Sequence, residues 1–190
     1  KTKPTQHSVA ALRSIGIQPD ALVLRSDRPV EAANRRKIAL MCDVDEAAVV
    51  NALDVASIYD IPSMLHSQDL DDYIVDHLRV DAGEMVWDGW AELLKSVHDP
   101  KHEVTIGIVG KYVSYEDSYK SLNEALLHGG VASNVRVNLK WIEAEEMTAD
   151  RLEAELDSVD GILVPGGFGI RGVSGMIEAV RYARERKVPY

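Results

Sequence analysis

The second half of the chain alternates short apolar runs with segments of helical periodicity. The apolar runs cover residues 104–109, 135–142 and 161–164. Helical patterns follow at residues 117–127, 150–156 and 173–186. Strands that alternate with helices pair in parallel, because each crossover helix returns the chain to the same end of the sheet. This alternation therefore predicts an α/β fold with a parallel sheet.

The first 80 residues predict part of a second α/β domain. Residues 21–24 form a continuous apolar run, typical of a buried strand, with Arg25 at its carboxyl end. Ligands of open α/β sheets collect at that end of the strands. The other expected elements here are a helix at 8–15, a helix at 31–41, a strand at 49–55 and two short helices within 56–79, split near Pro62.

Periodicity weakens between the two halves and at both ends. We therefore divide the chain into a domain at 1–80, a connector at 81–102 with one helix at 87–97, and a domain at 103–190. Lys1 lies within an expected functional loop, and Val188 begins an expected further strand. We expect the protein to continue beyond both ends.

Composition excludes several classes of protein. The content of 46% hydrophobic and 27% charged residues is that of a globular protein, and no apolar run approaches the length of a membrane span. The single cysteine, Cys42, excludes an internal disulfide framework and indicates a reducing compartment. With no signal sequence at the start, we expect a cytoplasmic protein that binds no membrane. Cys42 ends an apolar stretch, which favours burial over a role as nucleophile.

Charge is distributed unevenly along the chain. The net charge of −10 argues against nucleic acid as a partner. Residues 1–40 nevertheless carry eight Lys or Arg against three Asp or Glu, whereas residues 41–100 carry two against fourteen. A basic segment in an acidic protein indicates a local polyphosphate ligand, and the alternative is a solvated basic surface.

The segment Lys1–Gln6 combines two ammonium groups, two hydroxyl groups and an amide. If this segment is an extended loop, Lys1 and Lys3 share one face and a helix N-terminus follows. Each of these parts favours an anion. A charged N-terminal tail is the alternative reading.

A glycine-rich turn follows the apolar run at 161–164. Glycine imposes little restriction on φ, so the Gly166 and Gly167 N–H groups can be directed at a negatively charged oxygen, as in an oxyanion hole. Gly167, Gly169 and Gly172 also satisfy G-x-G-x-x-G, but a dinucleotide site requires the first βα turn and an acid about 20 residues later, which are not clearly present. A purely structural turn is the third reading.

Other possible catalytic motifs fail on spacing. Residues 107–112 lack the four-residue gap and the Ser or Thr of a phosphate-binding P-loop. The three basic residues at 35–37 cannot all reach one ligand from a helix. The acids near residue 70 and the scattered histidines fit no metal site, so no metal ligands are expected in this chain. No nucleophile lies on a strand-to-helix elbow.

Several motifs together closely resemble the CTP synthase family over the whole chain. KTKPTQ together with VPGGFG and its Arg-Gly is specific to that family, whereas VPGG alone indicates only class I glutamine amidotransferases. The other matching segments are SIGIQPD (14–20), RSDR (25–28), KIAL (37–40), SIY (57–59), LDDY (70–73), 104–112 and the remainder of 164–172.

This resemblance implies parts of two parallel-sheet, three-layer α/β domains. Residues 1–80 correspond to the end of a Rossmann or P-loop-like synthetase domain, 81–102 to the linker, and 103–190 to the first half of a flavodoxin-like class I amidotransferase domain. The whole enzyme would phosphorylate O4 of UTP with ATP and magnesium, and ammonia from L-glutamine would displace the phosphate to yield CTP. The family also implies CTP as a product inhibitor, GTP as allosteric activator and a homotetramer.

The resemblance assigns binding roles residue by residue. Contacts to UTP and CTP are implied for Lys1, Thr2, Lys3, Pro4, Thr5, Gln6 and Lys37. Contacts to ATP are implied for Arg25, Leu53, Asp54 and Val55. Gly167 matches the backbone contact to glutamine, and Lys120 and Arg171 match the GTP side.

The chain also departs from the family's full pattern. Ser174 occupies a place where relatives often carry an acid, which bears on the GTP contacts. The magnesium ligands are expected upstream of Lys1 and the nucleophilic cysteine beyond Tyr190, so no catalytic residue is expected within the chain and Cys42 is no substitute. We therefore expect this chain alone to be inactive. The alternative is a non-catalytic nucleotide-sensing or assembly module on the same scaffold.

Overall fold

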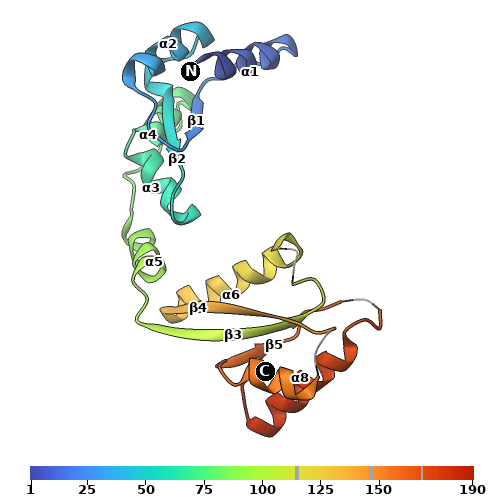
Figure 1. Cartoon of the computed structure of the whole chain (residues 1–190). Coiled ribbons are helices and arrows are strands. Elements are labelled where there is room, and N and C mark those ends of the chain that lie inside the picture. The colour runs from blue at the N-terminus through green and yellow to red at the C-terminus, as the bar shows by residue number, and fades with distance from the viewer. Residues whose placement is uncertain (114–115, 146–147, 168) are drawn as a thin grey trace. The chain divides into compact units, whose positions relative to one another are not determined.

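The computed structural model describes residues 1–113, 116–145, 148–167 and 169–190. These residues form two compact units, Lys1–Val86 and Trp87–Tyr190, each described here by itself (Figure 1). Both units are α/β and both sheets are parallel. The predicted fold class is therefore confirmed. None of the described helices is long and apolar enough to cross a membrane.

The first unit contains a two-stranded parallel sheet surrounded by helices. Its elements are α1 (Lys3–Ser14), β1 (Leu22–Ser26), α2 (Ala32–Cys42), β2 (Val49–Leu53), α3 (Ile61–His66) and α4 (Leu70–Leu78), with 3₁₀ turns at Glu46–Ala48 and Ile58–Asp60. Strands β1 and β2 start in register, with Leu22 opposite Val49. Their carboxyl ends therefore lie at the same edge of the sheet.

Two local predictions in this unit are wrong. The segment Lys1–Gln6 is not an extended loop, because α1 already begins at Lys3, and Pro4 occupies its first turn, where a missing N–H costs nothing. Residues 56–79 do not split at Pro62 either, because this proline also lies in a first helical turn. The break falls before α4, at Asp69, which adopts a left-handed conformation with φ of 57°.

The core of the first unit includes the cysteine. Cys42 is fully buried with Val9, Leu24, Ile38 and Val49 around it. Burial raises the pKa of the Cys42 thiol, and the nearby Arg13 charge offsets only part of this rise. The prediction that Cys42 is buried as a small hydrophobe is confirmed.

A glutamine side chain completes the hydrogen bonding of β2. Gln68, between α3 and α4, accepts a hydrogen bond from the Asn51 N–H at 2.8 Å and donates one to the Asn51 carbonyl at 2.8 Å. The Asn51 side chain in turn accepts from the Val30 N–H at 2.9 Å. Residues 51 and 68 thus link the sheet to the helical segment that follows it.

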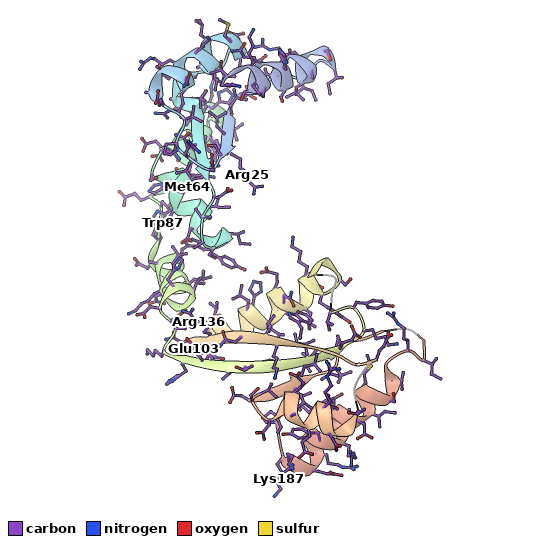
Figure 2. All side chains as sticks on the ribbon, viewed as in Figure 1. Arg25, Met64, Trp87, Glu103, Arg136 and Lys187 are labelled. Carbon is purple, nitrogen blue, oxygen red and sulfur yellow. The ribbon has the colours of Figure 1, made fainter. Side chains whose placement is uncertain are left out.

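The second unit contains a three-stranded parallel sheet in the order β4-β3-β5. Its elements are α5 (Asp88–His98), β3 (His102–Gly110), α6 (Lys120–Ser133), β4 (Val135–Glu143), α7 (Ala149–Leu156), β5 (Gly161–Leu163) and α8 (Val173–Arg186), with a 3₁₀ turn at Glu116–Tyr119. At the start of the sheet Glu103 and Arg136 are opposite each other and form an ion pair at 3.5 Å (Figure 2).

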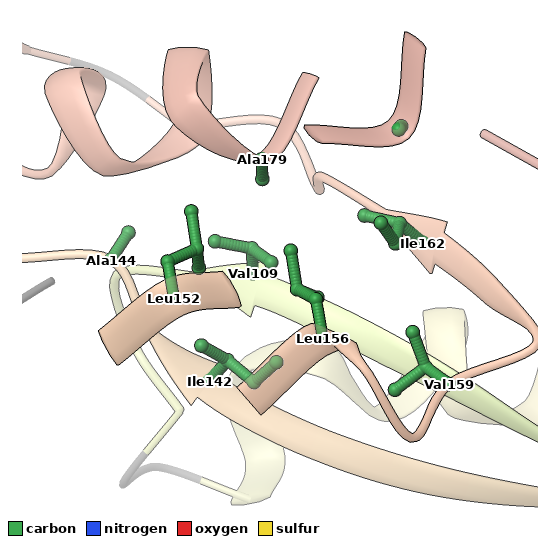
Figure 3. Packing of buried hydrophobic residues seen from close by; sticks show 9 residues of the cluster. Val109, Ile142, Ala144, Leu152, Leu156, Val159, Ile162 and Ala179 are labelled. Carbon is green, nitrogen blue, oxygen red and sulfur yellow. The ribbon is translucent and has the colours of Figure 1, made fainter. Parts of the chain in front are cut away.

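Helices cover both faces of this sheet. Helix α6 lies along one face and α8 along the other (Figure 1). On the α8 side, the core joins Leu152 and Leu156 of α7 and Ala179 of α8 to strand residues such as Val109 and Ile142 (Figure 3). The central strand β3 is buried over its last four residues, 107–110. The N–H of Ile162 donates to the Pro189 carbonyl at 2.9 Å, so the chain passes along the free side of β5 as it ends.

Helix α8 approaches the turn after β4 very closely. An added Cβ at Gly175 would lie 2.2 Å from the Ala144 carbonyl oxygen, a distance that no real atom pair tolerates. Glycine is therefore required at this contact. The contact places the start of α8, and the glycine turn that precedes it, close to the end of β4.

Candidate functional site

The first unit has a cavity of about 750 Å³ beside the carboxyl end of β1. It is formed by three elements, the start of α1, the end of β1 and the face of α2 that carries Asn34 and Ile38. Lys1, Thr5 and Arg25 bring positive charge and a hydroxyl group to its wall. A cavity with this lining suits an anionic ligand.

The start of α1 is held in place by its own side chains. Thr2 is only 8% exposed, and its hydroxyl accepts a hydrogen bond from the Gln6 side chain at 3.1 Å. Residues one helical turn apart share a face, so Lys1, Thr5 and Ser8 all reach the cavity. The contact between Thr2 and Gln6 supports the start of α1, and Val9 of the same helix packs in the core with residues of β1 and α2.

Two of the residues predicted to contact ATP lie together at the sheet edge. Arg25 ends in an exposed guanidinium group whose Nε is 3.3 Å from Oδ1 of Asp54, the first residue after β2. The Arg25 side chain projects from the end of β1 (Figure 2). Leu53 is the last residue of β2, and Val55 is exposed beyond it. Of these four residues, only Arg25 lines the cavity.

The residues predicted to contact UTP and CTP divide into two groups. Lys1, Thr2, Pro4 and Thr5 line the cavity. Lys3, Gln6 and Lys37 do not, although all belong to α1 or α2. Helical geometry explains part of the division, because Lys3 lies on the side of α1 opposite Pro4, Thr5 and Ser8. The Gln6 side chain instead donates to the hydroxyl group of Thr2. Lys37 is exposed on α2.

The second unit has a cavity of about 510 Å³ at the carboxyl end of its sheet. Tyr112, which follows β3, lines it together with Ser118, Tyr119, Gly166 and Gly167. Tyr119 is buried and stacks on Trp141 of β4, with 5.4 Å between the ring centroids. The cavity therefore has aromatic walls, and the two glycines contribute backbone groups.

The glycine turn uses its conformational freedom at positions other than those expected. Positive φ occurs at Gly169 (79°) and Gly172 (71°), not at Gly166 or Gly167. Within the described residues, neither the Gly166 nor the Gly167 N–H has a hydrogen-bond acceptor. Phe168 of the same turn lies outside the described residues. Because this turn follows β5, the third strand of its unit, it is not the first βα turn that a dinucleotide site requires.

Arg171 lies beside this cavity and Lys120 does not line it. The Arg171 guanidinium group is 5.3 Å from the centroid of the Tyr112 ring and forms an ion pair with Glu145. Its Nη2 also donates to the Lys111 carbonyl oxygen at 3.5 Å. Lys120 is the first residue of α6 and is exposed. Ser174 is exposed in the first turn of α8.

Sequence reasoning missed a buried lysine below the glycine turn. Lys111 is only 5% exposed, and its Nζ donates to the Gly169 carbonyl oxygen at 2.8 Å. Residues 107–112 were predicted to leave a strand without forming a P-loop, and residues 107–110 indeed belong to β3, but no role was predicted for Lys111. The available signal was the position of the lysine directly after a buried strand.

The described ranges contain no cluster of three or more side chains that could hold a metal ion. Neither cavity is lined by a cysteine or a histidine. The first cavity offers cations, hydroxyl groups and the Glu31 carboxylate, and the second offers hydroxyl groups and backbone N–H groups.

Comparison with known proteins matches the two structural units, Lys1–Val86 and Trp87–Tyr190, to two different families. Residues 1–80 match the family described as CTP synthase N-terminus, and residues 115–190 match glutamine amidotransferase class-I. The chain is 66% identical over 191 residues to the CTP synthase of Leifsonia xyli and 56% identical over 190 residues to that of Corynebacterium jeikeium. Each alignment covers 100% of this chain and 34% of the relative.

One similar solved structure is the glutaminase domain of a Trypanosoma brucei CTP synthase with bound acivicin. It is 40% identical, covers 46% of this chain and 34% of that chain, and has a TM-score of 0.43.

The two family matches define the class of this chain as a CTP synthase N-terminal region followed by a class I glutamine amidotransferase region. The chain belongs to the CTP synthase family and spans about a third of the length of the curated relatives it matches. The resemblance expected from the sequence is thereby confirmed.

Proposed function

We propose that this chain supplies the nucleotide-binding and glutamine-binding surfaces of a glutamine-dependent CTP synthase. In that reaction ATP phosphorylates O4 of UTP, and ammonia released from glutamine attacks C4 and expels the phosphate, giving CTP. The observation that carries the proposal is the cationic cavity of the first unit, which the resemblance independently assigns to nucleotides. For domain boundaries we propose 1–80, a linker at 81–102, and 103–190.

On the nucleotide side, the side chains of the cavity wall match the needs of a triphosphate. The Lys1 ammonium group and the Arg25 guanidinium group can neutralise phosphate oxygens, and the Thr2 and Thr5 hydroxyl groups can donate hydrogen bonds. We propose UTP and CTP contacts at residues 1–6 and 37, and ATP contacts at Arg25 and residues 53–55. Lys3, Gln6 and Lys37 enter this proposal through the resemblance alone.

On the glutamine side, the backbone of the second cavity supports an oxyanion role. Hydrolysis of the glutamine amide passes through a tetrahedral intermediate whose oxygen carries negative charge. The Gly167 N–H borders the cavity and has no acceptor among the described residues, so it is available to that oxygen. We propose Gly167 as the glutamine contact, with the aromatic side chains of Tyr112 and Tyr119 forming the walls.

Cofactors and effectors extend the proposal beyond the chain's own residues. ATP supplies the phosphoryl group and Mg²⁺ balances its charge, but the part of the chain that the structure describes contains no cluster of metal ligands. We therefore propose, from the resemblance, that the magnesium ligands lie upstream of Lys1. We propose GTP as an activator on the side of Lys120 and Arg171, where Arg171 already contacts a cavity residue, Tyr112. We propose a homotetramer from the resemblance, and a cytoplasmic location from the single cysteine, which indicates a reducing compartment.

The test measures UTP affinity by calorimetry on the full-length protein that contains this chain. We expect Lys1→Ala to weaken UTP binding about 10- to 100-fold, because a charge-assisted hydrogen bond is worth roughly 1.5–3 kcal/mol. Glutamine hydrolysis without nucleotide should change less than twofold, roughly the reproducibility of such an assay. Arg36→Ala is the matched control, because Arg36 is an exposed cation of α2 outside the cavity.

Lys3→Ala makes the test sharper. Lys3 is predicted to contact UTP but does not line the cavity. If Lys3→Ala weakens UTP binding while Lys1→Ala does not, the nucleotide binds on another face of α1. If neither variant has an effect, the proposal for the nucleotide side fails, and a scaffold without this activity becomes the better account.

A further inference from the structure

Lys111 joins the end of the central strand to the glycine turn. It follows Gly110, the last residue of β3, and its ammonium group donates to the carbonyl oxygen of Gly169, 58 residues later. Gly169 has φ of 79°, a conformation in which glycine has little steric restraint. The Lys111 ammonium group supplies this peptide group with a hydrogen bond from outside the turn.

The stem of the lysine also lies against the turn on both sides of this hydrogen bond. A Cβ built at Gly172 would be 3.4 Å from Lys111 Cγ, and one built at Gly167 would be 3.7 Å from Lys111 Cε. The side chain thus runs below the turn from Gly172 toward Gly167. One residue supports the part of the turn that borders the cavity and the part that leads into α8.

A second hydrogen bond connects the same two segments in the opposite direction. Arg171 donates to the Lys111 carbonyl oxygen at 3.5 Å, while its guanidinium group contacts Tyr112 and Glu145. The turn is therefore fastened to the end of β3 at two points. Of the two donors, Lys111 is the more buried, since it is 5% exposed, whereas the Arg171 side chain is about half exposed.

Removing the buried ammonium group has a predictable physical effect. The Gly169 carbonyl would lose its charged donor, and with it the interaction that favours this orientation of the peptide group over others. An oxyanion donor acts only when it lies about 2.7–3.1 Å from the developing charge, so small rotations of this turn matter.

We propose that Lys111 is a positioning residue for glutamine hydrolysis: it holds the glycine turn so that the Gly167 N–H points into the cavity. The inference rests on the proposed role of Gly167 in glutamine binding. Lys111 acts through the turn and does not itself contact the substrate.

The test uses Lys111→Met in the full-length protein that contains this chain. Methionine keeps much of the stem and removes the ammonium group. We expect kcat for glutamine hydrolysis to fall about 10- to 100-fold, somewhat less than the roughly 100- to 1,000-fold for loss of an oxyanion donor. KM for glutamine should change less than about threefold, because a displaced donor weakens the transition state more than the ground state. CTP formation from added ammonia should stay within about twofold, since it does not use this turn.

Lys101→Met is the control for a lysine-to-methionine change, since Lys101 is exposed just before β3. A kcat for Lys111→Met within twofold of the parent protein overturns the inference. So does an equal loss of hydrolysis and ammonia-dependent synthesis, which indicates a general structural role. If Lys111→Met does not fold, Lys111→Leu, which also lacks the donor, is measured by the same criteria; an unchanged kcat again overturns the inference, and a selective loss supports it.

Gly167→Val separates this inference from the proposed function. A selective loss of hydrolysis in Gly167→Val, with none in Lys111→Met, rejects the role of Lys111 and leaves the glutamine site in place. Unchanged hydrolysis in Gly167→Val rejects the proposed glutamine contact, whatever Lys111→Met does. Gly167→Ala should fold normally, because its Cβ would make only ordinary contacts and φ is not positive.

Discussion

The two units build their candidate sites from different parts of the polypeptide. In the first unit, side chains on α1 and β1 line the cavity, and the charged ends of Lys1 and Arg25 are exposed to solvent. In the second, a glycine turn contributes backbone groups, and a buried side chain, Lys111, supports that turn from below. Long charged side chains can adjust to small shifts of the backbone. Backbone N–H groups move with the backbone, so their distance to a ligand changes with every such shift.

The two units also differ in how their cores are stabilised. The second unit closes a nine-residue cluster between its sheet and helices α7 and α8. The smaller core of the first unit is supplemented by polar contacts, including the Gln68 hydrogen bonds to β2 and a His66 to Asp71 contact at 2.7 Å. We therefore expect substitutions of small residues to affect the second unit most, and changes of solution conditions to affect the first.

The largest expected effect is on the stability of the second unit. In Gly175→Ala the new methyl group would overlap the Ala144 carbonyl oxygen, so α8 would have to move away from the end of β4. We expect the free energy of unfolding of this unit to fall by about 3 kcal/mol, with no change in the first unit. Hydrogen exchange resolved by peptide measures the two units separately.

Gly129→Ala is the matched control, because an added Cβ at Gly129 of α6 has nothing within 4 Å. This change should stabilise the helix by roughly 0.5–1 kcal/mol. If the two alanine variants changed the free energy of unfolding by the same amount, the close contact at Gly175 would have no special effect on stability.

An intermediate effect is expected from ionic strength. UTP carries several negative charges and its proposed contacts are exposed cations, so added salt should weaken its binding several-fold. Glutamine has no net charge and its proposed contact is a backbone N–H, so its affinity should change little. Binding titrations at low and high salt check both statements, and a salt dependence of the same size for both ligands would contradict the comparison.

The smallest effect concerns acid and the first unit. Partial burial raises the pKa of the Asp71 carboxyl group, but hydrogen bonds from His66 and from backbone N–H groups lower it further, leaving the folded pKa below its usual value. Stabilisation by Asp71 is therefore complete above the usual Asp pKa of about 3.9 and is lost as pH falls through the folded value. Asp71→Asn should remove less than about 1 kcal/mol at neutral pH.

The same variant should show a shallower loss of stability in acid than the parent chain does. Denaturant titrations of the first unit between about pH 5 and pH 2 give this slope. Identical slopes for the two proteins would mean that the contact between His66 and Asp71 contributes nothing to the unit.

The sequence predicted best where periodicity alone decides the structure. Helix α8 has the expected bounds, Val173–Arg186, because Gly172 precedes an uninterrupted amphipathic segment. Prediction failed at Pro4 and Pro62, since a proline does not say by itself whether it ends a segment or begins a helix. Tertiary packing made that decision in both places.

The candidate sites could be predicted only in part. The residue types of Lys1–Gln6 were enough to predict a preference for an anion. Which of its side chains share a face depended on where α1 begins. The role inferred for Lys111 was not readable at all, because it depends on a contact with Gly169 across 58 positions. Local patterns do not report such distant contacts.

The Gln68 carboxamide has a consequence for how the first unit meets other chains. It occupies the backbone N–H and the backbone carbonyl of Asn51 on β2. These are the groups with which an incoming β-strand would otherwise pair. An unprotected sheet edge invites aggregation by strand addition. A single amide side chain thus blocks that route here, and any strand that enlarges this sheet has to join it beside β1.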